Sequence, residues 1–331
     1  MPRHHLVPQL VLRRFADDDG RIVMVARDSP HDAVQNNVSR AGAETGVYRI
    51  EQDDVQDGHR DGHDPELVEK ALAGLEDAVA PLLADLIEGR FPPPEVRHRV
   101  ALFVALQLTR GWAMREQVNR LGTLRMRASL RDTVTPERVR ERIGQDATDD
   151  EVGGFIEQVL GEDGPTLRLE KANMVQQTLR HGFETIAPLL GSRAWRVVSF
   201  DRPVLLTSDQ PVASWSPPRQ DRLPVGVANA RETYMPLDRR TALVITLRAA
   251  DEARDLHVHE PRLSRAARIN TAVAHGALRW LFHHSDDTPL RHLHLGPRDR
   301  WEEEVESVSE EPDGTLRVRG LYVPRSAVTR R

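Results

Sequence analysis

The segment HHLVPQLVLRRF at the start of the chain contains several side chains that exchange protons or bind anions. His4 and His5 are followed by Gln9, Arg13 and Arg14, and the other members of the segment are apolar. Histidine titrates near neutral pH, so it can serve as an acid, a base or a metal ligand. On an extended backbone His4 and His5 point to opposite faces, so we expect one of them to face a given pocket. The alternative is that one imidazole is an interior hydrogen-bonding group.

Two carboxylates lie on one side of the first long helix that we predict. Glu69 and Glu76 are seven residues apart, which is about two helical turns. Glu76 also borders the apolar stripe beside Leu72 and Val79. A carboxylate at such a border is either solvated or held by a partner, because burying an unpaired charge is costly. With His5, these carboxylates could hold a divalent metal ion or form an acid–base centre.

Gln107 and Arg110 are polar residues at inward positions of the second predicted helix. Gln107 continues the spacing of Val100, Phe103 and Val104 on the buried stripe, and Arg110 follows one turn later. A buried guanidinium needs a carboxylate or several carbonyl groups as partners. We therefore expect either an Arg–Glu clamp between the two helices or an anion-binding group in a pocket.

A further polar group follows a β-like run. Thr207, Ser208 and Asp209 come directly after the apolar residues 204–206, and a proline soon ends the run. Side chains at the end of a strand can project into a crevice, where catalytic groups are common. A turn cap explains them equally well, because Asp accepts hydrogen bonds from the amides that follow it. The Gly-x-Ser-x-Gly motif of many hydrolases is absent around Ser208.

Composition excludes several classes of site and partner. The 331 residues contain no cysteine, which rules out disulfides, thiolate nucleophiles and cysteine-based metal sites. A net charge of −5 provides no global field that would attract nucleic acid or anionic lipid. No apolar run approaches the roughly 20 residues that span a bilayer, and no signal peptide is evident, so we expect a cytoplasmic protein without a membrane partner. Phosphate-loop and dinucleotide fingerprints are also absent.

Short strands and long helices must position these side chains in the first two thirds of the chain. We expect strands over 21–27 and 45–50, a loop over 55–64, a helix that begins at Asp64 and is kinked at Pro81, and one long helix from Glu95 to about Arg131. Further helices are predicted over 136–143, 149–160 and 169–190.

The pattern changes to β near Trp195. Runs rich in β-branched residues predict strands over 195–200, 204–207, 234–235 and 242–247, then a helix over 261–283 and a strand over 316–323. The predicted fold class is therefore α+β, with a helical middle, short N-terminal strands and a β-rich C-terminal half. We expect one compact domain, with subdomains over 1–191 and 192–331 that meet near Ser192.

Several of these segments resemble a bacterial family. The opening HHLVPQLVLRRF, with Gly20 to Val23, is similar to the start of the family catalogued as domain of unknown function 4238. Further similarities are Val68-Glu69, Leu75-Glu76, Leu106-Gln107-x-x-Arg110, Thr207 to Val212, Met235-Pro236-Leu237-Asp238 and Asn270. Gln210 stands where we expect Asn in the family. The resemblance extends from His4 to about His283 and implies a fold and a set of positions, without an established activity.

Two hypotheses of function follow from these residues. In the first, the chain is a hydrolase or nuclease whose catalytic residues are His4, His5, Glu76 and Asp209, with His5, Glu69 and Glu76 as ligands of any metal ion. Its substrate would be an anionic small molecule or a nucleic acid, with phosphodiesters as one candidate class. The residues expected to bind it are Gln9, Arg13, Gln107, Arg110, Ser208 and Asn270. In the second, the same residues form a buried hydrogen-bond network in a non-catalytic binding or regulatory protein. The sequence leaves the oligomeric state open.

Overall fold

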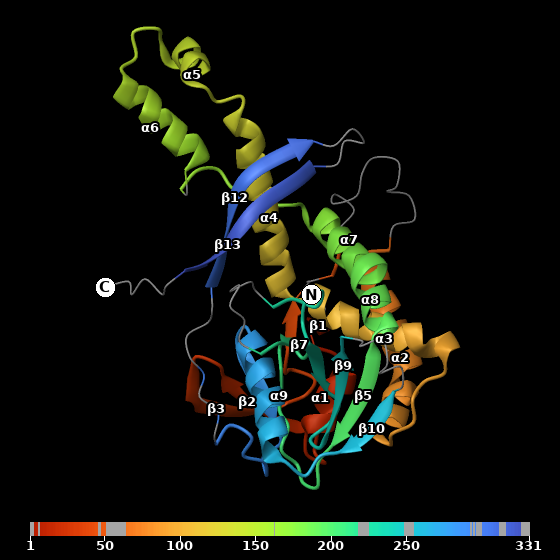
Figure 1. Ribbon diagram of the computed structural model, residues 1–331. Helices are drawn as coiled ribbons and strands as arrows, with labels where there is room; N and C mark the ends of the chain where they lie inside the picture. Colours follow the sequence, from red (N-terminus) through yellow and green to blue (C-terminus); the bar gives the residue numbers. More distant parts are fainter. Residues whose placement is uncertain are drawn as a thin grey trace. The chain divides into compact units, whose positions relative to one another are not determined.

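The computed structural model describes residues 3–5, 7–45, 48–50, 64–161, 163–217, 225–247, 255–291, 293, 295, 300–310 and 316–325. Its helices and open sheets confirm the α+β fold class (Figure 1). The chain divides into two units, of which the first comprises Met1–Met114 and Lys171–Arg298 and the second Arg115–Glu170 and Asp299–Arg331. The boundary that we predicted near Ser192 lies inside the first unit.

The larger sheet of the first unit has five strands in the order β10-β5-β9-β8-β7. These are β10 (Leu256–His259), β5 (Ala194–Ser199), β9 (Thr241–Thr246), β8 (Glu232–Pro236) and β7 (Ala213–Trp215). Neighbouring strands are antiparallel except for β10 and β5, which are parallel. Every residue of β8 and β9 is buried, which suits strands that are rich in β-branched residues and covered on both faces.

Two smaller sheets complete the β structure of the first unit. One has the order β3-β2-β11-β6 and consists of β3 (Ser29–Asn37), β2 (Arg21–Ala26), β11 (Trp280–His283) and β6 (Thr207–Ser208). The other pairs β1 (Arg3–His5) with β4 (Ala43–Thr45), and places His5 opposite Ala43. In the second unit β12 (Arg300–Glu310) and β13 (Leu316–Arg325) form an antiparallel pair.

Both units also contain helices. The first unit contains α1 (Gln9–Leu12) with the 3-10 turn η1 (Arg13–Phe15), α2 (Leu67–Ile87), α3 (Pro94–Thr109), α7 (Lys171–His181), α8 (Ala187–Ser192) and α9 (Leu263–Gly276). The second contains α5 (Pro136–Ile143), α6 (Asp149–Leu160) and most of α4 (Trp112–Arg131). Among the described residues, no helix is both long and apolar enough to cross a membrane.

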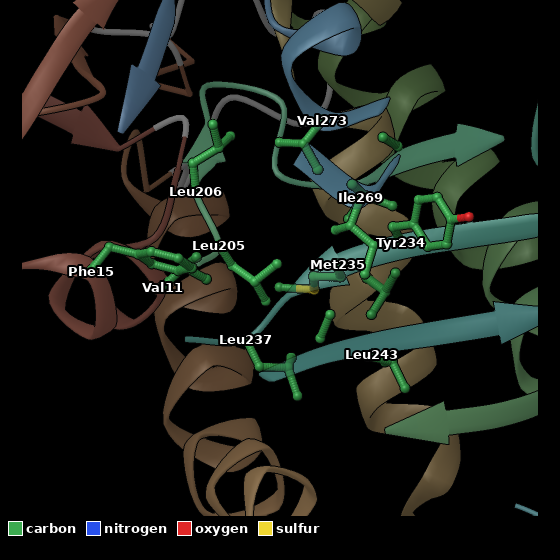
Figure 2. Packing of buried hydrophobic residues seen from close by; sticks show 14 of the residues in the cluster. Val11, Phe15, Leu205, Leu206, Tyr234, Met235, Leu237, Leu243, Ile269 and Val273 are labelled. Atoms are coloured by element: carbon green, nitrogen blue, oxygen red, sulfur yellow. The ribbon is translucent and has the colours of Figure 1, made fainter. Parts of the chain in front are cut away.

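The N-terminal segment is held by apolar side chains that enter the core of the first unit. Val11 and Phe15 are 2% and 0% exposed. They belong to the same buried cluster as Met235 of β8 and Leu205, which lies in the loop before β6. Figure 2 shows Val11 and Phe15 side by side next to Leu205. Burying large apolar side chains contributes about 1.5–3 kcal/mol each, so this packing fixes the position of the polar residues between them.

The prediction of one long helix from Glu95 to about Arg131 is wrong, because this range forms two helices. α3 ends at Thr109 and α4 begins at Trp112, with Arg110 and Gly111 between them. A Cβ atom on Gly111 would lie 2.3 Å from Gln210 Nε2, so the chain passes close to another segment at this point. Glycine also disfavours a helix interior, which agrees with a break here.

The predicted helix over 261–283 is also too long. α9 ends at Gly276, and residues 280–283 form β11, which pairs with β2 and β6. The predicted strand over 204–207 is reduced to β6 at Thr207–Ser208, and β4 ends at Thr45 with no strand over 48–50. In each case pairing with a distant strand, which local patterns do not report, sets the limits of the element.

Several other expectations differ in detail. The helix predicted over 169–190 is interrupted by a π-helical turn at Gly182–Ile186, and a Cβ atom on Gly182 would lie 2.7 Å from Thr109 Oγ1. α2 continues through Pro81 without interruption. The sequence did not indicate β3, β7 or β12. The loop that we predicted over 55–64 lies, except for Asp64, outside the described residues.

Candidate functional site

The first unit contains a cavity of about 540 Å³ that three segments of the chain line. These segments are the N-terminal residues from β1 to η1, one face of α2, and the end of α3. The polar lining residues are His5, Gln9, Arg13, Arg14, Glu69, Glu76, Asp77 and Arg110, and the apolar ones are Leu10, Leu72, Ala73 and Ala80. This volume is typical of a site for a small-molecule ligand.

Most of the residues predicted for the site meet at this cavity. His5, Gln9, Arg13, Glu69, Glu76 and Arg110 line it, and Gln107 contacts Arg110 from α3. The backbone of His4 belongs to β1, whereas its side chain lies outside the described part of the molecule. Ser208, Asp209 and Asn270 are not among the residues that line the cavity.

A chain of hydrogen bonds connects Arg13, Gln9 and His5, which follow one another at intervals of four residues. Arg13 Nη2 donates to Gln9 Oε1 at 2.8 Å, which turns the amide nitrogen of Gln9 toward His5. That nitrogen lies 3.2 Å from His5 Nε2. An amide N–H can only donate, so His5 Nε2 accepts and the neutral imidazole carries its proton on Nδ1.

The carbonyl oxygen of Ser39 competes for the same imidazole nitrogen. It lies 3.3 Å from His5 Nε2 and would require a proton on that atom. One neutral tautomer cannot satisfy both contacts. We favour the contact with Gln9, because the bond from Arg13 fixes the orientation of the amide.

Burial lowers the pKa of His5 below its usual value of 6.5. The Ser39 carbonyl and the negative charge of Glu76 act in the opposite direction, while the charges of Arg110 and Arg13 lower the pKa further. The imidazole is therefore neutral at pH 7, which is the form that accepts a proton.

Arg110 connects α2 and α3 beside the cavity. Its side chain is 2% exposed; Nη1 donates to Glu76 Oε1 at 3.0 Å and Nη2 donates to Gln107 Oε1 at 2.9 Å. Gln107 in turn donates to the carbonyl of Phe103 at 3.1 Å, and the hydroxyl of Tyr48 donates to the Arg110 carbonyl at 3.2 Å. The structure thus contains the Arg–Glu clamp that was one of the two alternatives for Arg110.

Two lining residues were not among those predicted for the site, although Arg14 was noted beside Arg13 in the opening segment. Arg14 is half-buried, and its Nη2 donates to the Ala80 carbonyl at 3.5 Å, while burial lowers its pKa. Asp77 is exposed at the cavity wall. Both follow a residue that was chosen, Arg13 or Glu76. The spacing of 69, 73, 76, 77 and 80 along one helical face could have identified Asp77.

The predicted metal ligands His5, Glu69 and Glu76 line the same cavity without forming a metal-binding group. Among the described residues, no three His, Asp or Glu side chains lie close enough together to hold a metal ion. The Glu76 carboxylate is instead bound by Arg110.

Asp209 holds the connection between α9 and β11. Its Oδ1 accepts a hydrogen bond from the amide of Leu278 at 2.8 Å, and its Oδ2 accepts from those of Arg279 at 2.7 Å and Trp280 at 3.1 Å. These bonds satisfy the amides of the turn that ends α9. The side chain thus binds backbone, as in the turn-cap alternative, but the amides belong to a distant segment and are not those that follow Asp209.

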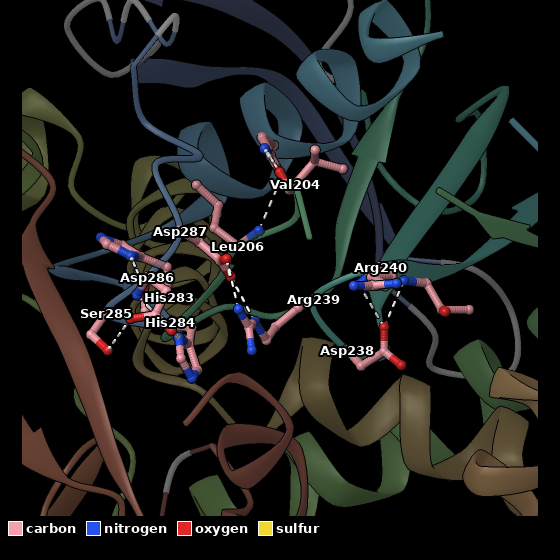
Figure 3. A network of polar contacts seen from close by, with 12 residues as sticks. Val204, Leu206, Asp238, Arg239, Arg240, His283, His284, Ser285, Asp286 and Asp287 are labelled. Atoms are coloured by element: carbon pink, nitrogen blue, oxygen red, sulfur yellow. Dashed lines mark hydrogen bonds and ion pairs between the residues drawn. The ribbon is translucent and has the colours of Figure 1, made fainter. Parts of the chain in front are cut away.

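Asn270 and Ser208 also bind neighbouring backbone. Asn270 Oδ1 accepts from the amide of Leu206 at 3.2 Å and Nδ2 donates to the carbonyl of Val204 at 2.8 Å, so α9 holds the residues before β6. Figure 3 shows Val204 and Leu206 beside the ion pair of Arg239 with Asp287. The Ser208 hydroxyl donates to the carbonyl of Gln210 at 2.7 Å and lies 3.1 Å from its amide.

We predict that Asp209→Ala destabilises the protein by about 2 kcal/mol, because three amides lose their acceptor. Denaturant unfolding would measure this. Asp286→Ala is the matched control, because the side chain of Asp286 is 79% exposed and its loss should change the free energy of unfolding by less than about 0.5 kcal/mol. An unchanged stability of Asp209→Ala would contradict the capping role.

Comparison with known proteins supports the resemblance seen in the sequence. No curated protein and no solved structure matches the chain. A family model described as "Protein of unknown function (DUF4238)" matches residues 3–287, a range that includes every segment lining the cavity. The chain therefore belongs to the DUF4238 family.

Proposed function

We propose that the chain is a hydrolase that acts on an anionic small molecule in this cavity. His5 is the general base, and Arg13 and Arg14 bind the anionic group. The observation that carries the proposal is that a neutral imidazole and several guanidinium groups, from segments distant in the sequence, line one cavity of ligand size.

In the proposed reaction, a water molecule attacks the electrophilic centre of the substrate while His5 Nε2 accepts a proton from it. The bond to the leaving group breaks, and the leaving group departs with the electron pair and takes a proton from solvent. The Gln9 amide, which donates to Nε2, must give way to the water. The guanidinium groups stabilise the negative charge that develops on the substrate.

A small phosphodiester is the first substrate class to test. A guanidinium can bind a phosphate through two parallel hydrogen bonds, which favours this class over neutral esters. Glu69, Glu76 and Asp77 also line the cavity, and the chain has a net charge of −5. Both features disfavour a nucleic-acid strand, which carries a charge at every phosphate.

We predict that His5→Gln lowers kcat about 10²- to 10⁴-fold with little change in KM, because the proton acceptor is lost. Arg14→Met should mainly raise KM. Initial rates on bis(p-nitrophenyl) phosphate, p-nitrophenyl phosphate and p-nitrophenyl acetate would measure both effects. His275→Gln, at an exposed position of α9, is the matched control. Full activity of His5→Gln would place the base elsewhere.

The lowered pKa of His5 predicts how activity and stability depend on pH. Since the folded protein favours the neutral imidazole, kcat/KM should stay level at and just above pH 6.5 and decline only below it. The contribution to stability has the same sign, since it is present above 6.5 and lost as pH falls toward the lowered pKa. The imidazole NMR signal of His5 can be assigned as the one that is missing in His5→Gln, and its pH titration would then measure the pKa. A midpoint above 6.5 would contradict the prediction.

The second candidate is a non-catalytic binding protein in which the same residues form a structural network. It is favoured by the fact that His5, Gln9, Arg13 and Arg110 are bonded to protein groups. It predicts a large fall in the melting temperature of His5→Gln, without hydrolysis of any probe. The hydrolase proposal predicts a fall of less than about 3 °C, because His5 is only half-buried and Gln keeps a polar group there. Thermal unfolding distinguishes the two.

A further inference from the structure

The cavity has walls of opposite charge. Helix α2 contributes Glu69, Glu76 and Asp77 to one wall, because these positions lie on one helical face. The N-terminal segment contributes Arg13 and Arg14 to the other. A ligand that carried only one kind of charge would meet an unfavourable wall as well as a favourable one.

The protein's internal ion pairs neutralise only part of this charge. Glu76 is paired with Arg110 at 3.0 Å. Within the described part of the chain, neither Asp77 nor Arg14 has an ion-pair partner within 4.0 Å, although both line the cavity. Asp77 and Arg14 thus face the same space without an ion-pair partner among the described residues, while the Ala80 carbonyl and the charge of Asp238 act on Arg14.

Buried donors at the cavity also lack acceptors. Arg14 Nη1 and Arg110 Nε are buried and have no hydrogen-bond partner among the described residues. Both atoms have almost no accessible surface, so they do not contact the cavity directly. An anionic group in the cavity would instead reach the exposed guanidinium of Arg13 and the part of the Arg14 side chain that lines the cavity. The carboxylates of α2 that line the cavity favour a cationic group on the same ligand.

We propose that the ligand of this cavity is a zwitterion, with an anionic group at Arg13 and Arg14 and an ammonium group at the wall formed by Asp77 and Glu69. This inference rests on the function proposed above and narrows its substrate to small molecules that carry both charges. Balanced walls then select against simple anions as well as against simple amines.

The spacing along α2 defines two possible distances between the anionic and the cationic group of the ligand. Arg14 bonds to the carbonyl of Ala80, which is one helical turn from Asp77. Glu69 lies eleven residues before Ala80, about 16 Å along the helix axis. A short zwitterion would therefore bind across Asp77, and a longer one would reach Glu69.

Aminoalkyl phosphonates test the inference, because they are not hydrolysed. Calorimetry on the full chain would compare 2-aminoethylphosphonate and 6-aminohexylphosphonate with hexylphosphonate and hexylamine. We expect at least one zwitterion to bind about fivefold more tightly than either singly charged compound, as for one solvent-accessible ion pair. Asp77→Asn should remove this preference for the short zwitterion and Glu69→Gln for the long one. Asp85→Asn, on the same helix outside the cavity, should leave it unchanged.

The outcomes separate this inference from the proposed function. Equal affinity for hexylphosphonate and both zwitterions would overturn the proposal of a zwitterionic ligand, but it would remain compatible with a hydrolase that binds an anion. A preference for the zwitterion that survives both Asp77→Asn and Glu69→Gln would also overturn it, because the ammonium would then bind elsewhere. No binding of any phosphonate would overturn both.

Discussion

The buried guanidinium of Arg110 is the constraint on which the cavity depends. A charge that is 2% exposed is tolerated only if its donors are paired, and here Glu76 of α2 and Gln107 of α3 provide the acceptors. The bond from Tyr48 to the Arg110 carbonyl attaches a third segment to the same point. Helix α3 ends at Thr109, directly before Arg110. The side chain of Arg110 therefore leaves the chain at the end of this helix and reaches Glu76 of α2.

The opposite wall of the cavity depends on apolar packing. Val7, Val11 and Phe15 alternate with the polar residues of the N-terminal segment, and all three are at most 2% exposed. Their burial holds a segment whose strand, helix and 3-10 turn are each only three or four residues long. Once the segment is fixed, the interval of four residues brings His5, Gln9 and Arg13 into one chain of hydrogen bonds, which sets the tautomer of the imidazole.

Asp209 and Asn270 illustrate how similar polar residues serve different purposes. Both carry side chains that could bind a ligand, yet their hydrogen bonds go to the backbone at the end of α9 and before β6. They hold the edge strand β6 and its neighbour β11 together, although the two strands are distant in sequence. Asp77, by contrast, makes no such bond within the described part of the chain and lies at the wall of the cavity.

The sequence by itself determined the α+β class, most helices, the border position of Glu76 and the inward positions of Gln107 and Arg110, because helical periodicity reports which face of an element is buried. Only the tertiary structure decided that the predicted helix over 95–131 breaks at Arg110 and Gly111 and that residues 280–283 pair as a strand. The tertiary structure also decided which of the predicted polar residues lie at the cavity, since His5 lines it and Asp209 does not. The physical reason is that strand pairing and convergence depend on contacts between distant segments, and local spacing carries no information about these contacts.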